Sequence, residues 1–201
     1  MFTGIITEVG RVRAMRRAGV GSDTRIEITA PGHAPTLVLG ASIACSGPCL
    51  TVVEKGPGWF AVEASAETLA RTSLGDWSAG TPVNLERSLA AGDEIGAHLV
   101  SGHVDAVVRV LARKEEGGSI RFEIELPPAQ APFVAAKGSV SLEGVSLTVN
   151  DVQRERFGIN IIRHTAEQTT LGAMVAGGRL NMEVDMLARY VERQLTARFR
   201  G

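Results

Sequence analysis

Short runs of alternating apolar and polar residues, separated by glycine and proline, fill most of the chain. Runs rich in Val, Ile and Thr at this spacing are typical of β-sandwiches and small β-barrels. In the first half, the pattern predicts strands at Ile5–Met15, Arg25–Thr29, Ser42–Cys45, Cys49–Glu54, Trp59–Ala64 and Pro82–Glu86. Gly47-Pro48 predicts a turn between two of them, because Gly tolerates positive φ and Pro fixes φ without an N–H.

One segment in each half interrupts the alternation and predicts a short helix. It covers residues 67–74 in the first half and 165–171 in the second, where Thr165 and Gln168 fit a capping box. Each half is therefore predicted to be mostly β, with one short helix. A small closed barrel is the natural way to hide the edges of such a sheet.

A different periodicity follows Asp185. Leu187, Val191, Leu195 and Phe199 recur every four residues and form one apolar stripe on a predicted helix. This helix either folds back on its own barrel or joins subunits into an oligomer. We favour the oligomerisation helix, because the rest of the chain forms a duplicated unit that folds without it.

The duplication is visible directly: with a constant offset of 97, residues 42–86 reappear as residues 139–183. The two copies share 14 identities in 45 aligned positions without a gap. We therefore expect an N-terminal barrel over 1–96, a second barrel over 97–186 and the helix over 187–201. Each barrel is long enough to bury a core, and two similar barrels imply two similar pockets.

Charge and composition limit the classes of molecule that the chain is expected to bind. The chain has 21 Lys and Arg against 22 Asp and Glu and no basic run, so it lacks the electrostatic footprint of a nucleic-acid binder. Small molecules or copies of the chain are the expected partners. The N-terminus reaches Glu8 after a short apolar stretch without a basic leader, which predicts no signal peptide, no membrane span and a cytoplasmic location.

The cysteines and histidines do not predict a metal site. Cys45 and Cys49 lack the spacing of a zinc site and a second Cys pair, and His98 and His103 have no obvious further ligand. We do not expect a disulfide, because cytosolic thiols stay reduced.

Five co-linear segments carry a family resemblance: MFTGII at the start, SGPCLTV at 46–52, LVSGHVD at 99–105, KGSVSLEGVSLTVN at 137–150 and HTAEQTTLG at 164–172. From Met1 to about Arg193 the chain resembles riboflavin synthase of the α-chain type. The resemblance implies an all-β fold of two tandem six-stranded Greek-key barrels and a C-terminal helix that holds a homotrimer. It also implies a transferase of riboflavin biosynthesis that needs no cofactor.

In the reaction that the resemblance implies, two molecules of 6,7-dimethyl-8-ribityllumazine exchange a four-carbon unit and yield riboflavin and 5-amino-6-ribitylaminouracil. The site would lie between the N-terminal barrel of one subunit and the C-terminal barrel of a neighbour. The internal repeat agrees with this chemistry, because a dismutation of two identical substrates requires two similar sites with different roles. Holding two rings face to face can contribute roughly 7 to 11 kcal/mol through proximity.

Cys49 and Ser146 are the first catalytic candidates. They align across the repeat, two residues before Thr51 and Thr148, so the members of each pair face the same side of a strand. This spacing predicts two polar side chains in each cavity. The resemblance implies that they bind the pteridine and assist the addition of a nucleophile or water. Alternatively, Cys49 is a small buried hydrophobic residue.

Further candidates lie where the halves differ. His103 aligns with Ile5 and could move a proton from the lumazine 7-methyl group, or could be a structural histidine. Lys137 and Asp185 are candidates for orienting substrate or stabilising charge, with a solvated turn and a strand end as the alternatives. Glu143 stands where the family commonly has Asp, which lengthens the reach of the carboxylate by one methylene.

The resemblance places other residues around the ring and the ribityl chain. A polyol needs several partners, because an unpaired buried hydroxyl costs about 1 to 3 kcal/mol. Phe2 either covers the N-terminal pocket or belongs to the core. The remaining predicted binding residues are Gly4, Ile5, Ile6, Ser42, Leu50, Thr51, Glu63, Ala64, Ser65, Ala66, Glu67, Thr68, Gly102, Leu147, Thr148, Asn160, Ile161, Ile162, Arg163, His164 and Thr165.

Two other functions compete with this interpretation. A lumazine-binding fluorescent protein would bind the ligand without catalysis. Such relatives tend to lose the second pocket and the trimer helix, whereas this chain has the Leu-Thr-Val motif in both halves and the apolar stripe of the C-terminal helix. A flavin-binding barrel of a reductase would need a nicotinamide-binding partner domain. The chain has no G-x-G-x-x-G between a strand and a helix.

Overall fold

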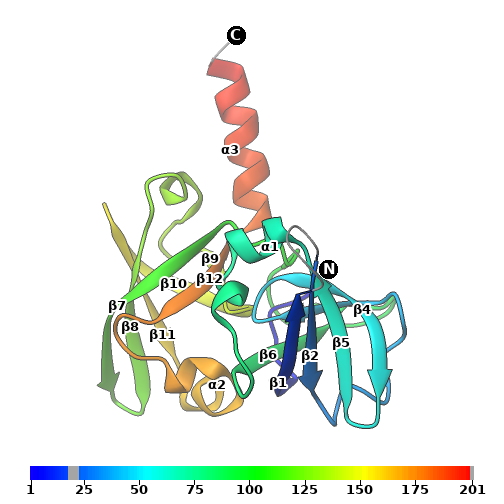
Figure 1. Cartoon of the computed structure of the whole chain (residues 1–201). Coiled ribbons are helices and arrows are strands. Elements are labelled where there is room, and N and C mark those ends of the chain that lie inside the picture. Colours follow the sequence, from blue (N-terminus) through cyan, green and yellow to red (C-terminus); the bar gives the residue numbers. More distant parts are fainter. Residues whose placement is uncertain (18–22, 200–201) are drawn as a thin grey trace.

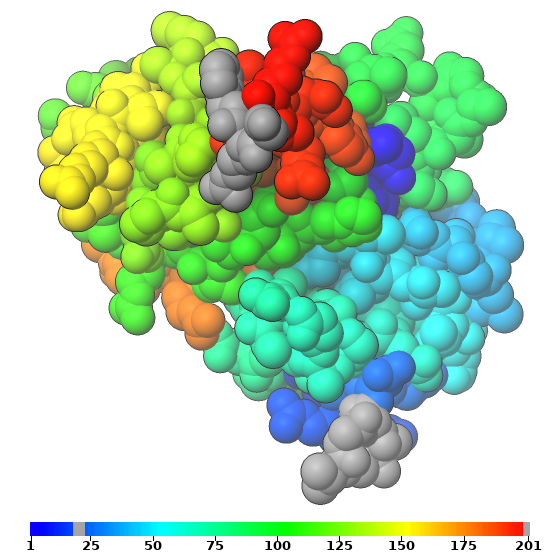
Figure 2. Space-filling view, turned by 90° about the horizontal axis from the view of Figure 1, so that it is seen from above, coloured from blue at the N-terminus to red at the C-terminus, as the bar shows by residue number. Residues whose placement is uncertain are grey.

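The computed structural model describes residues 1–17 and 23–199, which form two closed six-stranded antiparallel barrels and a C-terminal helix. The barrels lie side by side, as both views of the molecule show (Figure 1, Figure 2). The predicted all-β class with tandem six-stranded barrels is therefore confirmed.

The first barrel follows the cyclic order β1-β2-β5-β4-β3-β6. Helix α1 (Ala66–Arg71) and a 3₁₀ helix (Ser73–Asp76) connect its last two strands. The strands are β1 (Glu8–Arg17), β2 (Thr24–Thr29), β3 (Ser42–Cys45), β4 (Cys49–Gly56), β5 (Trp59–Ala64) and β6 (Pro82–Arg87).

The second barrel repeats this order as β7-β8-β11-β10-β9-β12. Helix α2 (Arg163–Gln168) and a 3₁₀ helix (Thr170–Ala173) again precede the last strand, and a third 3₁₀ helix covers Ala131–Phe133. The strands are β7 (Ala106–Glu116), β8 (Ser119–Glu125), β9 (Ser139–Leu142), β10 (Val145–Gln153), β11 (Arg156–Ile161) and β12 (Arg179–Val184).

Each barrel buries its own core through strand alternation. In β4, Leu50 and Val52 point inward and are 5% and 0% exposed, whereas Cys49 and Thr51 point outward. The fourth strand of the second barrel repeats this pattern from Ser146 onward. The polar residues of both motifs therefore face the outside of a barrel, not its interior.

Several boundaries differ from the sequence prediction, and three of the differences bear on the site. The first strand begins at Glu8 instead of Ile5, because the preceding residues cross to the other barrel. The helix predicted over 67–74 ends at Arg71 and continues as a separate 3₁₀ helix. The capping box at Thr165 is wrong: α2 begins at Arg163 after Ile162, which provides no side-chain cap, so Thr165 lies inside the helix.

Helix α3 (Met186–Phe199) projects away from both barrels (Figure 1), so it does not fold back on its own barrel. Its stripe is open to solvent, since Leu187, Val191 and Leu195 are 66%, 58% and 47% exposed. The side chain of Phe199 lies outside the described residues. Across the described ranges, we find no helix with the length and apolar character needed to cross a membrane.

Candidate functional site

The segments that lead into the barrels cross between them. Residues 3–6, the first lead segment, lie against the second barrel, where the Ser146 amide donates a 2.9 Å hydrogen bond to the Gly4 carbonyl. Residues 101–104, the second lead segment, lie against the first barrel, where the Cys49 amide donates a 2.8 Å bond to the Gly102 carbonyl. Each candidate site therefore contains parts of both halves of the chain.

Glycine is required at both crossings. Gly4 and Gly102 have φ values of +74° and +79°, which side chains rarely adopt. A Cβ on Gly4 would lie 2.6 Å from the Ser146 nitrogen, and one on Gly102 would lie 2.5 Å from the Cys49 Cβ. Close backbone packing thus fixes how each lead segment approaches the start of β4 or β10.

Two hollows form at these crossings. The N-barrel hollow, about 200 Å³, lies between α1, the start of β4 and the second lead segment. It is lined by Pro48, Cys49, Glu67, Thr68, Arg71, Thr72, Gly102, His103 and Val104. The C-barrel hollow, about 170 Å³, is lined by Gly4, Ile5, Ile6, Ala97, Val145, Ser146, His164, Thr165, Gln168 and Thr169.

The two hollows correspond residue by residue. Every residue of the N-barrel hollow has its repeat partner in the other hollow, and Thr68 and Thr72 are matched by identical residues. Their polar groups nevertheless differ. The unlike pairs are Cys49 with Ser146, Glu67 with His164, Arg71 with Gln168 and His103 with Ile5. The chain therefore presents two hollows with equivalent walls and different polar groups.

His98 contacts a residue of the C-barrel hollow, although the sequence analysis considered it only as a metal ligand and set it aside. Its Nδ1 lies 2.6 Å from the Ser146 Oγ. Burial lowers the pKa of His98, and the Asp185 and Glu183 carboxylates offset part of this shift. His98 falls ahead of the part of the second copy that can be aligned with the first, so comparison of the halves gives no signal there.

Asp185 stands at the start of α3, where its Oδ1 accepts a 2.9 Å hydrogen bond from the Leu187 amide. It therefore both begins the helix and contributes charge near His98. Cys49 is half-buried in its hollow, whereas Cys45 is fully buried and burial raises the pKa of its thiol. Both thiols are free.

Many predicted residues line the hollows of a single chain. These are Gly4, Ile5, Ile6, Cys49, Glu67, Thr68, Gly102, His103, Ser146, His164 and Thr165. Sequence reasoning missed Arg71, Thr72, Gln168 and Thr169, whose positions on the helical segments facing the hollows could have been found by extending the repeat alignment.

Other predicted residues lie elsewhere. The side chains of Phe2, Leu50, Ala64, Leu147 and Ile161 are buried in apolar clusters, so any contact that they make with a ligand would involve the backbone. Thr51 and Thr148 are exposed outside the hollows, so only one residue of each predicted polar pair lines a cavity of the single chain. Ser42, Glu63, Ser65, Ala66, Lys137, Asn160, Ile162 and Arg163 do not line either hollow.

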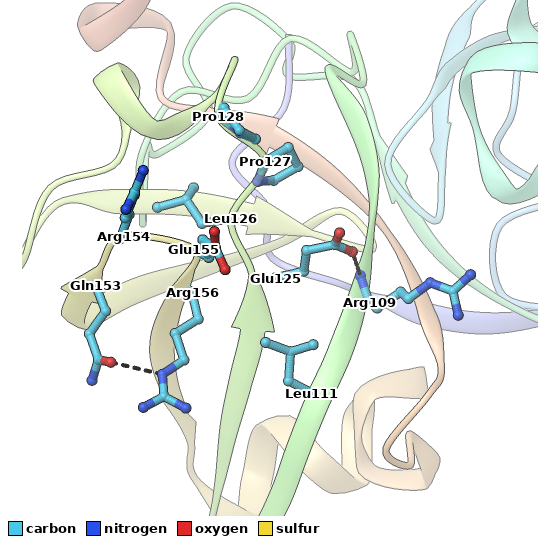
Figure 3. Close-up of a pocket in the computed structure, with 10 residues that line it drawn as sticks. All are labelled: Arg109, Leu111, Glu125, Leu126, Pro127, Pro128, Gln153, Arg154, Glu155 and Arg156. Atoms are coloured by element: carbon cyan, nitrogen blue, oxygen red, sulfur yellow. Dashed lines mark hydrogen bonds between the residues drawn. The ribbon is translucent and has the colours of Figure 1, made fainter.

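Two larger hollows lie apart from these sites. One of about 770 Å³ crosses the outer face of the second barrel (Figure 3), where Arg156 bonds Gln153 and the Arg109 amide bonds Glu125. None of the predicted site residues lines it. The other, about 410 Å³, lies between the barrels beside Glu143. Neither is lined by Cys49, Ser146 or the lead segments, so size alone does not identify the functional site.

Comparison with known proteins agrees with this geometry. Residues 3–88 and 101–185 each match the family model "Lumazine binding domain". The crystal structure of LumP complexed with riboflavin has the same fold, with a TM-score of 0.84 and 22% identity over 92% of this chain and 99% of that one. Fold and site thus define a tandem lumazine-binding barrel protein.

Curated relatives identify the family more closely. Riboflavin synthase of Brucella abortus (strain 2308) is 50% identical over 198 residues, covering 96% of this chain and 97% of the relative. Riboflavin synthase of Bacillus subtilis (strain 168) is 35% identical over 195 residues, covering 97% and 90%. The chain belongs to the riboflavin synthase family, whose members are transferases.

Proposed function

We propose that this chain catalyses the dismutation of two molecules of 6,7-dimethyl-8-ribityllumazine. A four-carbon unit passes from one molecule to the other, and riboflavin and 5-amino-6-ribitylaminouracil are released. One observation carries the proposal: the two hollows have equivalent walls and unlike polar groups. A reaction in which two copies of one substrate play different roles needs such a pair of sites.

The proposed residue roles follow from the contacts. Ser146, bonded to His98, adds to the ring or activates water at the C-barrel site, and Asp185 maintains the charge balance of that histidine. Cys49 binds the ring of the second substrate. His103 exchanges a proton at the N-barrel site. The polar side chains of α1 and α2 bind the ribityl hydroxyls.

We further propose that the N-barrel hollow of one subunit faces the C-barrel hollow of its neighbour in a homotrimer joined by α3. The exposed apolar stripe of α3 supports this assembly, because packing it against two copies removes apolar surface from water. The roles of Lys137 and Ser42, the cytoplasmic location and the lack of nucleic-acid or membrane partners stay predictions.

The test is to incubate the purified protein with 6,7-dimethyl-8-ribityllumazine alone, without nucleotide or metal, and to quantify both products. Equal amounts of riboflavin and 5-amino-6-ribitylaminouracil, with two lumazines consumed per riboflavin, are expected. Tight binding without conversion would instead favour a non-catalytic lumazine- or flavin-binding protein.

A further inference from the structure

The last strand of each barrel carries an Asn-x-Glu pattern, at residues 84–86 in β6 and residues 181–183 in β12. The middle residue points into the barrel core. The Asn and Glu side chains point outward and are nevertheless almost fully buried, at 1% and 6% exposure in β6 and 1% and 2% in β12. Buried polar groups need partners. The Asn side chains find them in the opposite half of the chain, whereas each Glu bonds the lead segment of its own half, which crosses to the opposite barrel.

Asn84 in the first barrel holds two edges of the C-barrel hollow. Its Nδ2 donates a 2.9 Å hydrogen bond to the Glu143 carbonyl, in the turn that leads directly to Ser146. Its Oδ1 accepts a 2.8 Å bond from the Thr170 amide, next to the hollow residue Thr169. One side chain thus fixes both the start of β10 and the end of the α2 segment.

Glu86 holds a third edge of the same hollow. Its carboxylate accepts bonds from the Thr3 amide at 2.7 Å, the Thr3 hydroxyl at 2.8 Å and the Gly4 amide at 2.9 Å. Gly4 in turn accepts the Ser146 amide bond, and Ile5 and Ile6 line the hollow. The strand β6 therefore supports the C-barrel hollow on three sides.

The strand β12 does the same for the N-barrel hollow. Asn181 accepts a 2.7 Å bond from the Ser73 amide and donates a 2.8 Å bond to the Ser46 carbonyl, in the turn that leads to Cys49. Glu183 accepts bonds of 2.7 to 2.9 Å from the amides of residues 101–103. The support is reciprocal and involves equivalent atoms.

We propose that Asn84 and Glu86 are positioning residues of the C-barrel hollow, and that Asn181 and Glu183 are positioning residues of the N-barrel hollow. Each site is held in shape by the opposite barrel of its own chain. This inference rests on the proposed function of both hollows as ligand sites. Its consequence is a crossed pattern: a change in β6 weakens the site of the second barrel and spares the site of the first.

The histidines provide separate reporters of the two hollows. His103 lines the N-barrel hollow, while His164 lines the C-barrel hollow and His98 bonds Ser146 there. His33 bonds Thr7 outside both hollows and serves as the internal reference. Ring signals of these four residues, the only histidines of the chain, are followed by NMR as riboflavin is added.

The paired variants are Asn84→Asp and Asn181→Asp. Each keeps the acceptor for the amide of Thr170 or Ser73 and replaces the donating NH₂ by an oxygen that faces a carbonyl. Asn84→Asp is expected to weaken riboflavin binding about tenfold in the His98 and His164 titrations and to leave the His103 titration unchanged, because a buried carbonyl loses its donor. Asn181→Asp is expected to give the reverse.

Asn150→Asp, a half-buried position on β10, controls for the exchange of amide for carboxylate and should change neither titration. A gentler pair keeps the test valid if the buried Asp variants do not fold: Thr3→Val and Ser101→Ala each remove one hydroxyl bond to Glu86 or Glu183. Thr3→Val should weaken only the C-barrel hollow and Ser101→Ala only the N-barrel hollow.

Equal weakening of both hollows by either variant, or weakening of the hollow in the variant's own barrel, would overturn the crossed assignment. A wild-type protein in which riboflavin shifts none of the three hollow histidines would overturn the proposed function itself. The two failures are therefore distinguishable in one set of titrations.

Discussion

The Nδ1 atom of His98 lies 2.6 Å from the Oγ of Ser146. Burial favours the neutral imidazole, which can accept the hydroxyl proton, and Asp185 supplies a carboxylate that favours the charged ring once it forms. This contact joins a residue of the segment between the barrels to the start of strand β10. The C-barrel hollow therefore contains a hydroxyl that is hydrogen-bonded to a histidine, whereas the N-barrel hollow has the thiol of Cys49 in place of Ser146.

Replacing His98 by Gln should lower kcat by about 10² to 10⁴, the usual contribution of a positioned acid or base, and should leave riboflavin binding at the N-barrel hollow unchanged. Because burial lowers the pKa of His98, wild-type kcat should fall only below pH 6.5, where the ring takes up a proton. Steady-state rates across pH measure both effects. Ser146→Ala is the matched variant, and an undiminished kcat in His98→Gln would remove this histidine from the mechanism.

Cys49→Ser should retain at least about a tenth of kcat, because Ser places a hydroxyl where the second hollow already has Ser146. The same position can be probed chemically. A thiol reagent should modify only Cys49 in each chain, because Cys45 is fully buried. Riboflavin should slow this modification, because Cys49 lines the N-barrel hollow. Complete loss of turnover in Cys49→Ser with intact ligand binding would indicate covalent thiol chemistry instead.

The paired hollows could be predicted from the sequence because the residues that line them recur in both copies of the repeat. Cys49 and Ser146 align, and alternation along a strand places both on the outside of a barrel. The reach of Asn84 and Asn181 across the chain could not be predicted. They stand out only as an identical pair, and their partners depend on how one barrel is placed against the other.

The mistaken start of α2 has a local cause. Strand β11 ends at Ile161 and the chain turns at once, so the helix begins before the capping-box pattern at Thr165. In the first half, Ser65 at the equivalent position caps α1 by accepting the Thr68 amide bond. The repeat alignment pairs Thr165 with Thr68, which lies inside α1. The alignment therefore predicts the start of α2 better than the capping-box pattern does.

Placing charge on the stripe of α3 tests the oligomer. The double variant Val191→Glu, Leu195→Glu should be monomeric by light scattering and should keep its fold, because both side chains are exposed in the single chain. Turnover should fall at least about tenfold while riboflavin still binds, since effective molarity is lost when the two substrates are no longer held together. Arg193→Glu, at another exposed position of the helix, is the control, and full activity of a monomeric double variant would contradict the intersubunit site.

Gly102→Ala should lower the unfolding free energy and weaken ligand binding at the N-barrel hollow by more than the strain of its positive φ alone would cause. Gly177 has a similar φ of +85° with nothing near its missing Cβ, so Gly177→Ala should lower the unfolding free energy by about 1 to 2 kcal/mol. At Gly102 the new methyl would also meet the Cys49 Cβ at 2.5 Å. A larger loss in urea unfolding and a weakened His103 titration are expected, and equal losses in the two variants would show that the crossing tolerates a side chain.

Glu143 occupies the position that Ser46 occupies in the first barrel. Both residues have φ near +50° in a tight turn, and each side chain accepts a backbone amide bond, from Asn181 at 2.6 Å and Asn84 at 3.1 Å. Burial between the barrels raises the pKa of Glu143 to about 7, against the opposing effect of its hydrogen bonds from Asn181 and Ser46. Below about pH 7 the protonated carboxyl is therefore favoured in the folded chain.

This raised pKa predicts that Glu143 makes the folded state less stable as pH rises. Between the ordinary value of 4.5 and about 7, the folded state holds a proton that the unfolded state has released, so the unfolding free energy falls through this window by about 3 kcal/mol in total. Glu143→Gln keeps an acceptor for Asn181 but cannot ionise. The difference in unfolding free energy between variant and wild type, measured by urea denaturation, should therefore shift in favour of the variant from pH 4.5 to pH 7. A difference that is the same at every pH in this window would show that Glu143 ionises as readily in the folded chain as in the unfolded one.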